Sequence, residues 1–346
     1  MMKKAIALVL SVMLFISCAV TAAGCAEDKK INIVTTIFPI YDWVREVVGS
    51  DAEHVRVSLL LDNGVDLHSY QPSAQDILSI STADLFIYVG GESDEWVEDV
   101  LESAMNPGLK AISLVEAMGE EIKMEEIVEG MDHEHEHGDE DHDHDHEHEG
   151  EDHDEDHDEH EHEHEHEDEA DEHVWLSLKN ARKLTAVIAD TLAETDPDFA
   201  DYYRENAAVY TGKLADLDAR YTEMADNAKF RTILFGDRFP FRYLADDYGL
   251  TYYAAFSGCS AESEASFATI LFLARKVDEL GLPAVLTIEH PRTRIAETVV
   301  QNTAAKNQKI LVLDSMQGTT ASDIQAGMNY LSVMEANLEV LKEALN

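Results

Sequence analysis

The sequence predicts an α/β protein of two lobes joined by one long helix, with a ligand site in the cleft between the lobes. Short apolar runs alternate with segments of helical periodicity in both halves of the chain, which is typical of parallel sheets covered by helices. Between the halves, residues 199–225 keep an apolar side chain every three or four positions without a break, as one long helix does.

In the first half, four apolar runs rich in β-branched residues predict strands, and the segments between them have helical spacing. The strands are expected at residues 31–37, 54–61, 85–90 and 110–115, and the helices at residues 40–48, 73–80 and 96–105. Ser73 is a good N-cap for the second of these helices, because Asp76 follows three residues later.

The alternation resumes after a predicted helix at residues 177–194 and the long helix. Strands are expected at residues 231–235, 250–256, 284–289 and 309–313, and helices at residues 241–248, 266–280, 293–306 and 324–345. We therefore divide the chain into a Rossmann-like α/β lobe (31–195), a bridging helix (196–227) and a second Rossmann-like lobe (228–346). A cleft between two lobes is a common place for a small ligand.

The first 24 residues have the composition of a secretory signal peptide. Lys3 and Lys4 precede an apolar run over residues 5–23, and small residues follow. The sequence Ala-Ala-Gly-Cys ending at Cys25 resembles a bacterial lipoprotein box, which implies lipidation of Cys25 and anchoring on the extracytoplasmic face of the cell membrane. The alternative is an uncleaved membrane anchor, since the apolar run is long for a signal.

The acidic residues are concentrated in one block. The chain has a formal net charge of −46, which argues against nucleic acid and anionic membrane surfaces as partners. Residues 131–172 contain no Lys or Arg, and we expect them to form a disordered loop, because they lack the apolar residues needed to fold. Their alternating imidazoles and carboxylates are suited to several weak, exchangeable Zn²⁺ sites. The candidate loop ligands are His133, His135, His137, His142, His144, His146, His148, His153, His157, His160, His162, His164 and His166.

Four other candidate ligands follow predicted strands. His68 and His173 come from the first half, and Asp237 and Asp314 from the second. Because the carboxyl ends of parallel strands meet at one edge of a sheet, these side chains can converge. A mixed set of imidazoles and carboxylates suits Zn²⁺ or Mn²⁺.

Four segments resemble the zinc/manganese-type solute-binding proteins of bacterial ABC importers. They are VDLHSYQPSAQDI (65–77), EHVWLSLKNARKL (172–184), DPDFADYYRENAAVYTGKLADLD (196–218) and AGMNYLSVMEANLEVL (326–341). The resemblance extends over residues 31–345 and implies two lobes on one rigid helix, with the metal between them. It implies that His68 and His173 are first-lobe ligands and that Asp314 is the last ligand. A His-rich acidic insertion is typical of the zinc members.

The third ligand departs from that family, which has a His or a Glu before an aromatic-rich helix. Counting back from Tyr243 puts Arg238 at this position, and a guanidinium cannot bind a cation. We expect Asp237 to be the ligand instead, with Glu262 or Glu264 as alternative oxygen donors.

Other polar residues near these positions are given supporting roles. Arg238 and Arg242 are expected to pair with carboxylates and hold them in place. Glu289 is a candidate either for orienting a ligand or for binding the metal itself. Cys259 could attract a soft metal, but a single thiol in an exported chain more often simply packs in the fold.

The sequence thus predicts a receptor that binds Zn²⁺ outside the cytoplasm and delivers it to the permease subunit of an ABC importer. Such a receptor needs no covalent chemistry, and we expect it to be a monomer. A Mn²⁺ receptor is the first alternative, and a surface adhesin or metal buffer is the second. A metal-dependent hydrolase is disfavoured, because Glu289 is the one plausible general base.

Overall fold

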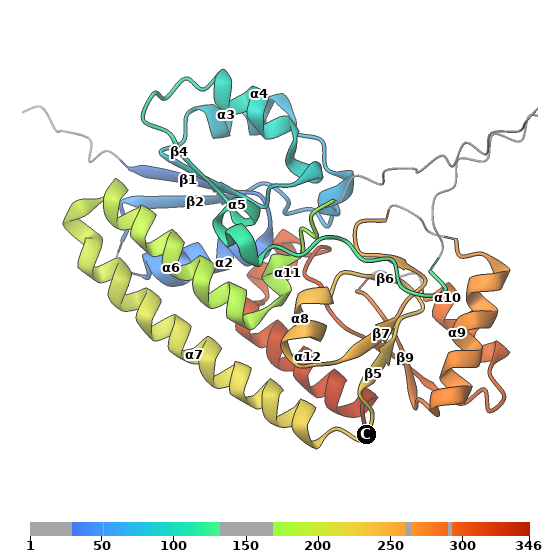
Figure 1. The fold of residues 1–346 in the computed structure, drawn as a ribbon. Helices are drawn as coiled ribbons and strands as arrows, with labels where there is room; N and C mark the ends of the chain where they lie inside the picture. Colours follow the sequence, from blue (N-terminus) through green and yellow to red (C-terminus); the bar gives the residue numbers. More distant parts are fainter. Residues whose placement is uncertain (1–29, 51, 132–168, 261–263, 290–292) are drawn as a thin grey trace, which may run out of the picture.

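The first four strands form one parallel sheet. The computed structural model describes residues 30–346 except residue 51 and the segments 132–168, 261–263 and 290–292. The sheet has the order β2-β1-β3-β4, and all its pairings are parallel (Figure 1). Its strands are β1 (Ile31–Thr35), β2 (Val55–Leu59), β3 (Leu85–Tyr88) and β4 (Lys110–Ser113). The four predicted strands are confirmed, and each ends two residues earlier than predicted.

Helices cover both faces of this sheet because its strands are apolar on both faces. They are α2 (Phe38–Val48), α3 (Ala74–Ser81), α4 (Trp96–Glu102) and the short α5 (Leu114–Met118), which was not predicted. Val34 and Phe86 pack with α3 and α4, whereas Ile33 and Ile87 belong to the main core with α2. The predicted cap of α3 is present, since Ser73 and Asp76 form a reciprocal capping box.

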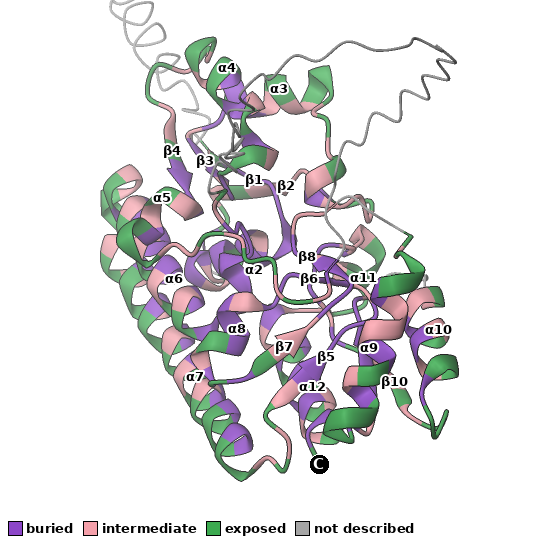
Figure 2. Cartoon of the chain, turned by 45° about the vertical axis from the view of Figure 1, so that its right-hand side comes forward, coloured by how far each residue is buried: buried purple, intermediate pink, exposed green. Residues whose placement is uncertain are grey.

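The long helix α7 (Ala200–Asn227) runs along one side of the molecule (Figure 1). At about 1.5 Å per residue, its 28 residues span roughly 42 Å. It packs on α6 (Leu178–Thr195), on α2 and on α12 (Tyr330–Ala344), so it contacts helices from both halves of the chain. Its buried residues recur every three or four positions, and Figure 2 shows the helix coloured partly buried and partly exposed along its length. The predicted long helix is confirmed, with a 3₁₀ turn (Pro197–Phe199) before it.

The second half contains three parallel strand pairs. They are β5 (Thr232–Leu234) with β7 (Thr251–Tyr253), β6 (Arg238–Phe239) with β8 (Phe256–Ser257), and β9 (Ala284–Thr287) with β10 (Lys309–Val312). A parallel bridge between Phe235 and Leu286 connects β5 to β9. The other helices are α8 (Arg242–Asp247), α9 (Phe267–Leu280), α10 (Arg294–Asn302) and α11 (Ala321–Gln325).

Two predicted elements of the second half are wrong in extent. The strand expected at residues 250–256 divides into β7 and β8, which pair with different strands. The helix expected at residues 324–345 is two helices, α11 and α12. It is interrupted because Asn329 takes an extended conformation and caps α12, with its side chain accepting a hydrogen bond from Ser332 N.

Tyr330, at the start of α12, connects the two halves. Its backbone N–H donates to Asp42 Oδ2 (2.9 Å), and its hydroxyl donates to the carbonyl of Trp175 (2.6 Å). Trp175 Nε1 in turn donates to the carbonyl of Ser315 (2.9 Å). Tyr330, Trp175 and Ser315 are fully buried. The two halves therefore share one continuous core rather than meeting only through α7.

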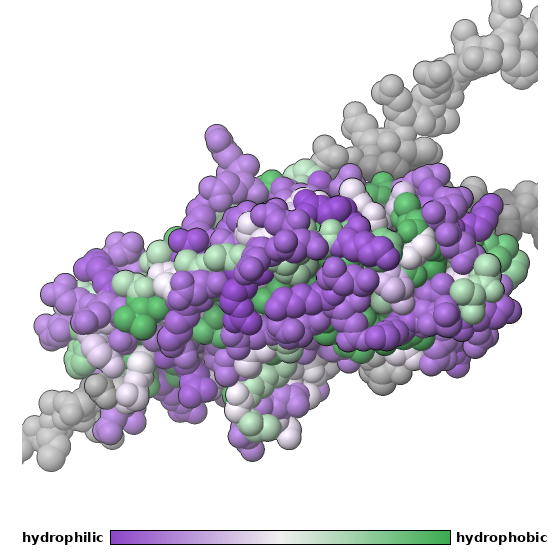
Figure 3. Space-filling model, turned by 90° about the horizontal axis from the view of Figure 1, so that it is seen from below, coloured by the Kyte–Doolittle hydropathy of each residue, from purple (hydrophilic) through white to green (hydrophobic). Residues whose placement is uncertain are grey.

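No helix in the described part of the chain combines the length and the apolar composition needed to cross a bilayer. The face seen in Figure 3 is covered mainly by hydrophilic side chains, with apolar ones in small patches between them.

We predict that Tyr330→Phe lowers the free energy of unfolding by about 1 to 2 kcal/mol, because it leaves the buried Trp175 carbonyl without its donor. Tyr210→Phe is the matched control: Tyr210 is equally buried, but its hydroxyl has no partner among the described residues. This variant should change stability by less than about 0.5 kcal/mol. Urea denaturation followed by tryptophan fluorescence measures both, and equal effects would contradict the assigned role of Tyr330.

Candidate metal centre

Two imidazoles and one thiol meet at the carboxyl ends of the strands. The Nε2 atoms of His68 and His173 are 3.2 Å apart. One ring nitrogen of each histidine and the sulfur of Cys259 all lie within 4.8 Å of one another. His68 lies in a 3₁₀ turn (Leu67–Ser69) after β2, His173 precedes the turn Val174–Leu176, and Cys259 follows β8. The predicted convergence of His68 and His173 is thus present in the structure.

The ring of His173 is held in one orientation by Asp171. One carboxylate oxygen, Asp171 Oδ1, accepts hydrogen bonds from both the backbone N and the Nδ1 of His173, each at 2.9 Å. Because a carboxylate only accepts, the neutral imidazole carries its proton on Nδ1, and the lone pair of Nε2 points toward His68. His173 is fully buried. This arrangement is the one that prepares a histidine to bind a metal.

His68 is held in a similar way. Asp66 caps its turn by accepting from the backbone N of His68 (3.0 Å), and His68 Nδ1 lies 2.8 Å from Ser93 Oγ. Burial, together with the nearby His173, lowers the pKa of His68 to about 3. His68 is therefore neutral at physiological pH, which leaves a nitrogen lone pair available for a cation.

Two buried carboxylates lie behind the histidines. Glu172 Oε1 accepts from Ser93 N (2.8 Å), while its Oε2 lies 3.7 Å from His68 Nδ1 and has no hydrogen-bond partner among the described residues. Burial raises the pKa of Glu172 to about 7 and that of Asp94 to about 6. Gly91 has a φ of +80°, and any Cβ there would collide with Glu172 Oε1. Negative charge in this region favours a bound cation.

Arg238 forms an ion pair with Asp66, and both side chains are nearly buried. This pair links the second half of the chain to the residue that caps the His68 turn. Arg242 Nη2 lies 3.5 Å from Glu126 Oε2. The expectation that Arg238 and Arg242 pair with carboxylates is confirmed by these contacts.

Asp237 lies outside the group of three ligand atoms. Its Oδ2 accepts from Thr287 Oγ1 (2.6 Å) and Ile288 N (3.3 Å), and its Oδ1 accepts from Arg238 N (2.9 Å). This carboxylate therefore joins the ends of neighbouring strands within the second half. Glu264, an alternative oxygen donor, is exposed.

Asp314 follows β10 and also lies outside the group of three. Its Oδ1 accepts from Met316 N (2.8 Å), and burial, followed by the charge of Glu289, raises its pKa to about 7. Glu289 accepts hydrogen bonds from the backbone N–H groups of Ser315, Gln317 and Gly318. Glu289 thus fixes the loop that carries Asp314, and the Trp175–Ser315 bond ties this loop to the region of His173.

Cys259 is not among the four ligands predicted from the sequence, which favours packing over metal binding for this thiol. A positional signal was available, because Cys259 follows the end of β8 by two residues, as the other candidates follow their strands. Gly258 lets this segment approach the histidine: a Cβ there would lie 3.0 Å from His173 Cε1. The backbone N of Cys259 donates to Glu125 Oε1 (2.8 Å).

A short antiparallel pairing closes the base of the His-rich block. Met124 pairs with Ala170, and the backbone N of Asp171 donates to the carbonyl of Lys123 (2.8 Å). Tyr243 OH accepts from Lys123 N and donates to the carbonyl of Asp171, each at 2.9 Å. The predicted disordered loop at residues 131–172 is therefore too long at its end, since Asp171 is buried and hydrogen-bonded.

Some predicted residues cannot be placed. The thirteen loop histidines from His133 to His166, Glu262 and the predicted lipidation site Cys25 lie outside the described residues.

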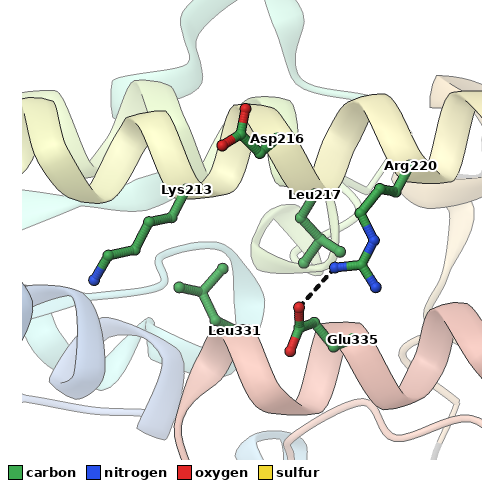
Figure 4. Close-up of a pocket in the computed structure, with 6 residues that line it drawn as sticks. All are labelled: Lys213, Asp216, Leu217, Arg220, Leu331 and Glu335. Carbon is green, nitrogen blue, oxygen red and sulfur yellow. Dashed lines mark hydrogen bonds and ion pairs between the residues drawn. The ribbon is translucent and has the colours of Figure 1, made fainter.

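A separate pocket lies between α7 and α12 (Figure 4). Its lining consists of Lys213, Asp216, Leu217, Arg220, Leu331 and Glu335. Arg220 Nη1 is 2.7 Å from Glu335 Oε1 across it. None of the candidate metal ligands lines this pocket, so the histidine pair remains the candidate centre.

Comparison with known proteins relates the chain to zinc uptake. The family model for the periplasmic zinc-uptake complex component A (ZnuA) matches residues 33–344. The zinc-binding lipoprotein AdcA of Streptococcus pneumoniae is 32% identical over 340 residues, which cover 96% of this chain and 60% of AdcA. The chain therefore spans about 60% of the length of that relative. The high-affinity zinc uptake system protein ZnuA of Bacillus subtilis is 30% identical over 93% of this chain and 90% of its own.

Solved structures show the same fold. The Zn(II)-bound ZnuA-like domain of Streptococcus pneumoniae AdcA is similar to this chain with a TM-score of 0.66 and 30% identity, covering 91% of this chain and 99% of that domain. The metal-dependent lipoprotein YcdH of Bacillus subtilis has a TM-score of 0.67 and 26% identity, covering 91% of this chain and 99% of its own.

We predict that Asp171→Ala weakens Zn²⁺ binding by about 10- to 100-fold, because His173 loses the acceptor that fixes its ring and tautomer. Asp171→Asn keeps an accepting oxygen and should lose less. Asp216→Ala, on the exposed face of α7, is the control and should bind as the wild type does. Isothermal titration calorimetry measures all three, and unchanged affinity in Asp171→Ala would refute the role of Asp171.

Proposed function

Because the chain belongs to the family of periplasmic zinc-uptake complex component A proteins, we propose that it binds Zn²⁺ outside the cytoplasm and delivers it to the permease of an ABC importer. The observation that carries this proposal is the pair of imidazoles whose Nε2 atoms lie 3.2 Å apart, with His173 fully buried and the side chain of His68 8% exposed. The names of the AdcA and ZnuA relatives support Zn²⁺ as the cargo.

The spacing of the two nitrogens fits a zinc ion. Two imidazole nitrogens at about 2.0–2.1 Å from a tetrahedral Zn²⁺ are separated by about 3.3–3.4 Å. The Nε2 atoms of His68 and His173 are already 3.2 Å apart. An ion placed between the rings thus needs little rearrangement of the two histidines.

We propose His68 and His173 as two ligands and Asp314 as the oxygen donor of the same site. Asp314 is supported by its place in the loop that Trp175 ties to the region of His173. Asp237 is less suitable, because its carboxylate is already engaged by Thr287 and Ile288. Asp314→Asn should therefore weaken Zn²⁺ binding more than Asp237→Asn does.

The remaining functional assignments are also part of this proposal. The chain acts as a binding protein and not as an enzyme, in keeping with a family of transport components. A lipid on Cys25 would hold it near its permease, as the name of the lipoprotein AdcA suggests for that relative. The His-rich block would gather zinc near the site, because neutral imidazoles bind Zn²⁺ well and Mn²⁺ poorly.

We predict that the double variant His68→Ala/His173→Ala loses the tight Zn²⁺ site, because both nitrogens that face the ion are removed. Replacing residues 132–168 with a Gly/Ser linker should keep one tight site and lose the weaker ones. His54→Ala is the matched control, since His54 pairs with Asp196 and is not in the ligand group. Calorimetry counts the sites, and a tight site that survives in the double variant would refute the assignment.

Growth under zinc chelation tests the transport role. Cells that lack the gene should grow poorly, and the wild-type gene should restore growth while the double histidine variant does not. Normal growth without the gene, in a strain with no second zinc importer, would contradict a role in import and favour an adhesin or a metal buffer.

A further inference from the structure

We propose that Cys259 binds the metal through its sulfur, so that a thiolate takes part in the centre with His68 and His173. This inference rests on the proposed zinc-binding function and goes beyond it, because it names an unpredicted ligand and the class of metal it selects. The class is thiophilic divalent ions such as Zn²⁺ and Cd²⁺, in preference to Mn²⁺.

The position of the sulfur is the first argument. Cys259 Sγ and the two histidine nitrogens lie within 4.8 Å of one another, and no other described set of three or more His, Cys, Asp or Glu residues converges in this way. A zinc ion at about 2.3 Å from sulfur and 2.0–2.1 Å from nitrogen places these atoms about 3.5 Å apart. A shift of about 1.3 Å or less therefore brings the sulfur into the first coordination shell.

The second argument is the buried nitrogen that faces this group. His173 is fully buried and its Nδ1 is engaged by Asp171, so among the described residues the polar partner of its Nε2 is His68 Nε2, 3.2 Å away. In the free protein this nitrogen can accept a hydrogen bond from Nε2–H of His68, whose Nδ1 then accepts from Ser93 Oγ. A metal ion between the side chains would take the place of that shared proton, so that both imidazoles turn a lone pair to the ion.

The third argument is the replacement at position 238. Arg238 cannot coordinate a cation, and it is held in an ion pair with Asp66. With His68, His173 and Asp314 as three ligands, a four-coordinate zinc site has one position left for another donor. Cys259 supplies one from the end of β8, the strand that pairs with the strand of Arg238.

The surroundings of the thiol explain why a metal is needed to ionise it. A thiol has an ordinary pKa of about 8.5, so at neutral pH the free protein holds mostly neutral thiol. The carboxylate of Glu125 accepts from the backbone N of Cys259, and those of Glu172 and Asp171 lie nearby. On binding, the S–H bond breaks, the sulfur lone pair forms the bond to Zn²⁺, and one proton leaves to solvent. The same carboxylates that disfavour a free thiolate favour a divalent cation beside it.

Cobalt spectroscopy gives a direct test in the full chain with Cys18→Ser and Cys25→Ser, where Cys259 is the only thiol. One equivalent of Co²⁺ should produce a thiolate-to-cobalt charge-transfer band in the near ultraviolet. Cys259→Ser should abolish the band and weaken Zn²⁺ binding by about 100-fold or more. Removing a ligand should reduce the affinity more than removing a residue that only orients a ligand. X-ray absorption spectroscopy at the zinc edge should show a Zn–S distance of about 2.3 Å in the parent chain and not in Cys259→Ser.

Calorimetry in buffers of different ionisation enthalpy provides a second readout. The parent chain should release about one more proton per Zn²⁺ than Cys259→Ser does. The preference for Zn²⁺ over Mn²⁺ should fall in Cys259→Ser, because the soft ligand is lost. Thermal unfolding of the metal-free proteins checks that Cys259→Ser is folded, and Cys259→Ala repeats the test with a smaller side chain.

The outcomes separate the two proposals. If the Co²⁺-loaded protein shows no charge-transfer band and Cys259→Ser binds Zn²⁺ as tightly as the parent chain, the thiolate ligand is refuted. The proposal of a zinc receptor would not be affected by that result. Absence of any tight Zn²⁺ site in the parent chain would overturn both.

Discussion

The fixed orientation of the buried His173 ring is the constraint on which the centre depends. A single oxygen of Asp171 accepts from both the backbone and the side chain of His173, which sets the tautomer before any ion arrives. The surrounding contacts keep this unit in place: Tyr243 from the second half binds the carbonyl of Asp171, and the carbonyl of Trp175 accepts from Tyr330. A packed interface between the halves and a prepared nitrogen ligand are thus parts of one arrangement.

The second half contributes less regular structure to the centre than the first. His68 and His173 are positioned by a four-stranded parallel sheet and its loops, whereas Arg238 lies in the two-residue strand β6 and Cys259 follows the two-residue strand β8. Gly258 allows the backbone beside Cys259 to approach His173. Arg238 faces the same region but is committed to Asp66, so it supports the turn of His68 by charge and not by coordination. The charge of the centre is therefore set by both halves together.

Sequence reasoning found the local features and missed several long-range ones. The strands of the first sheet, the cap at Ser73 and the two histidines follow from periodicity, capping chemistry and position after strands. The role of Asp237 does not follow from position alone, because an Asp after a strand can bind a metal or hold neighbouring strand ends. The structure adds its contacts with Thr287 and Ile288, which no sequence pattern indicates. Cys259 lies 86 positions beyond His173 in the sequence, and only the folded chain brings its sulfur to the imidazoles.

The pairing of Met124 with Ala170 has a consequence for how this protein can change over time. Because Met124 and Ala170 hold the two ends of the intervening chain together, extra residues between them add a cost of loop closure to the folding free energy. Each doubling of such a loop costs only about 0.6 kcal/mol. Histidine repeats can therefore be gained or lost by insertion and deletion while the geometry of the adjoining centre is preserved. The number of zinc ions that the block can bind and the affinity of the centre can therefore change independently of each other.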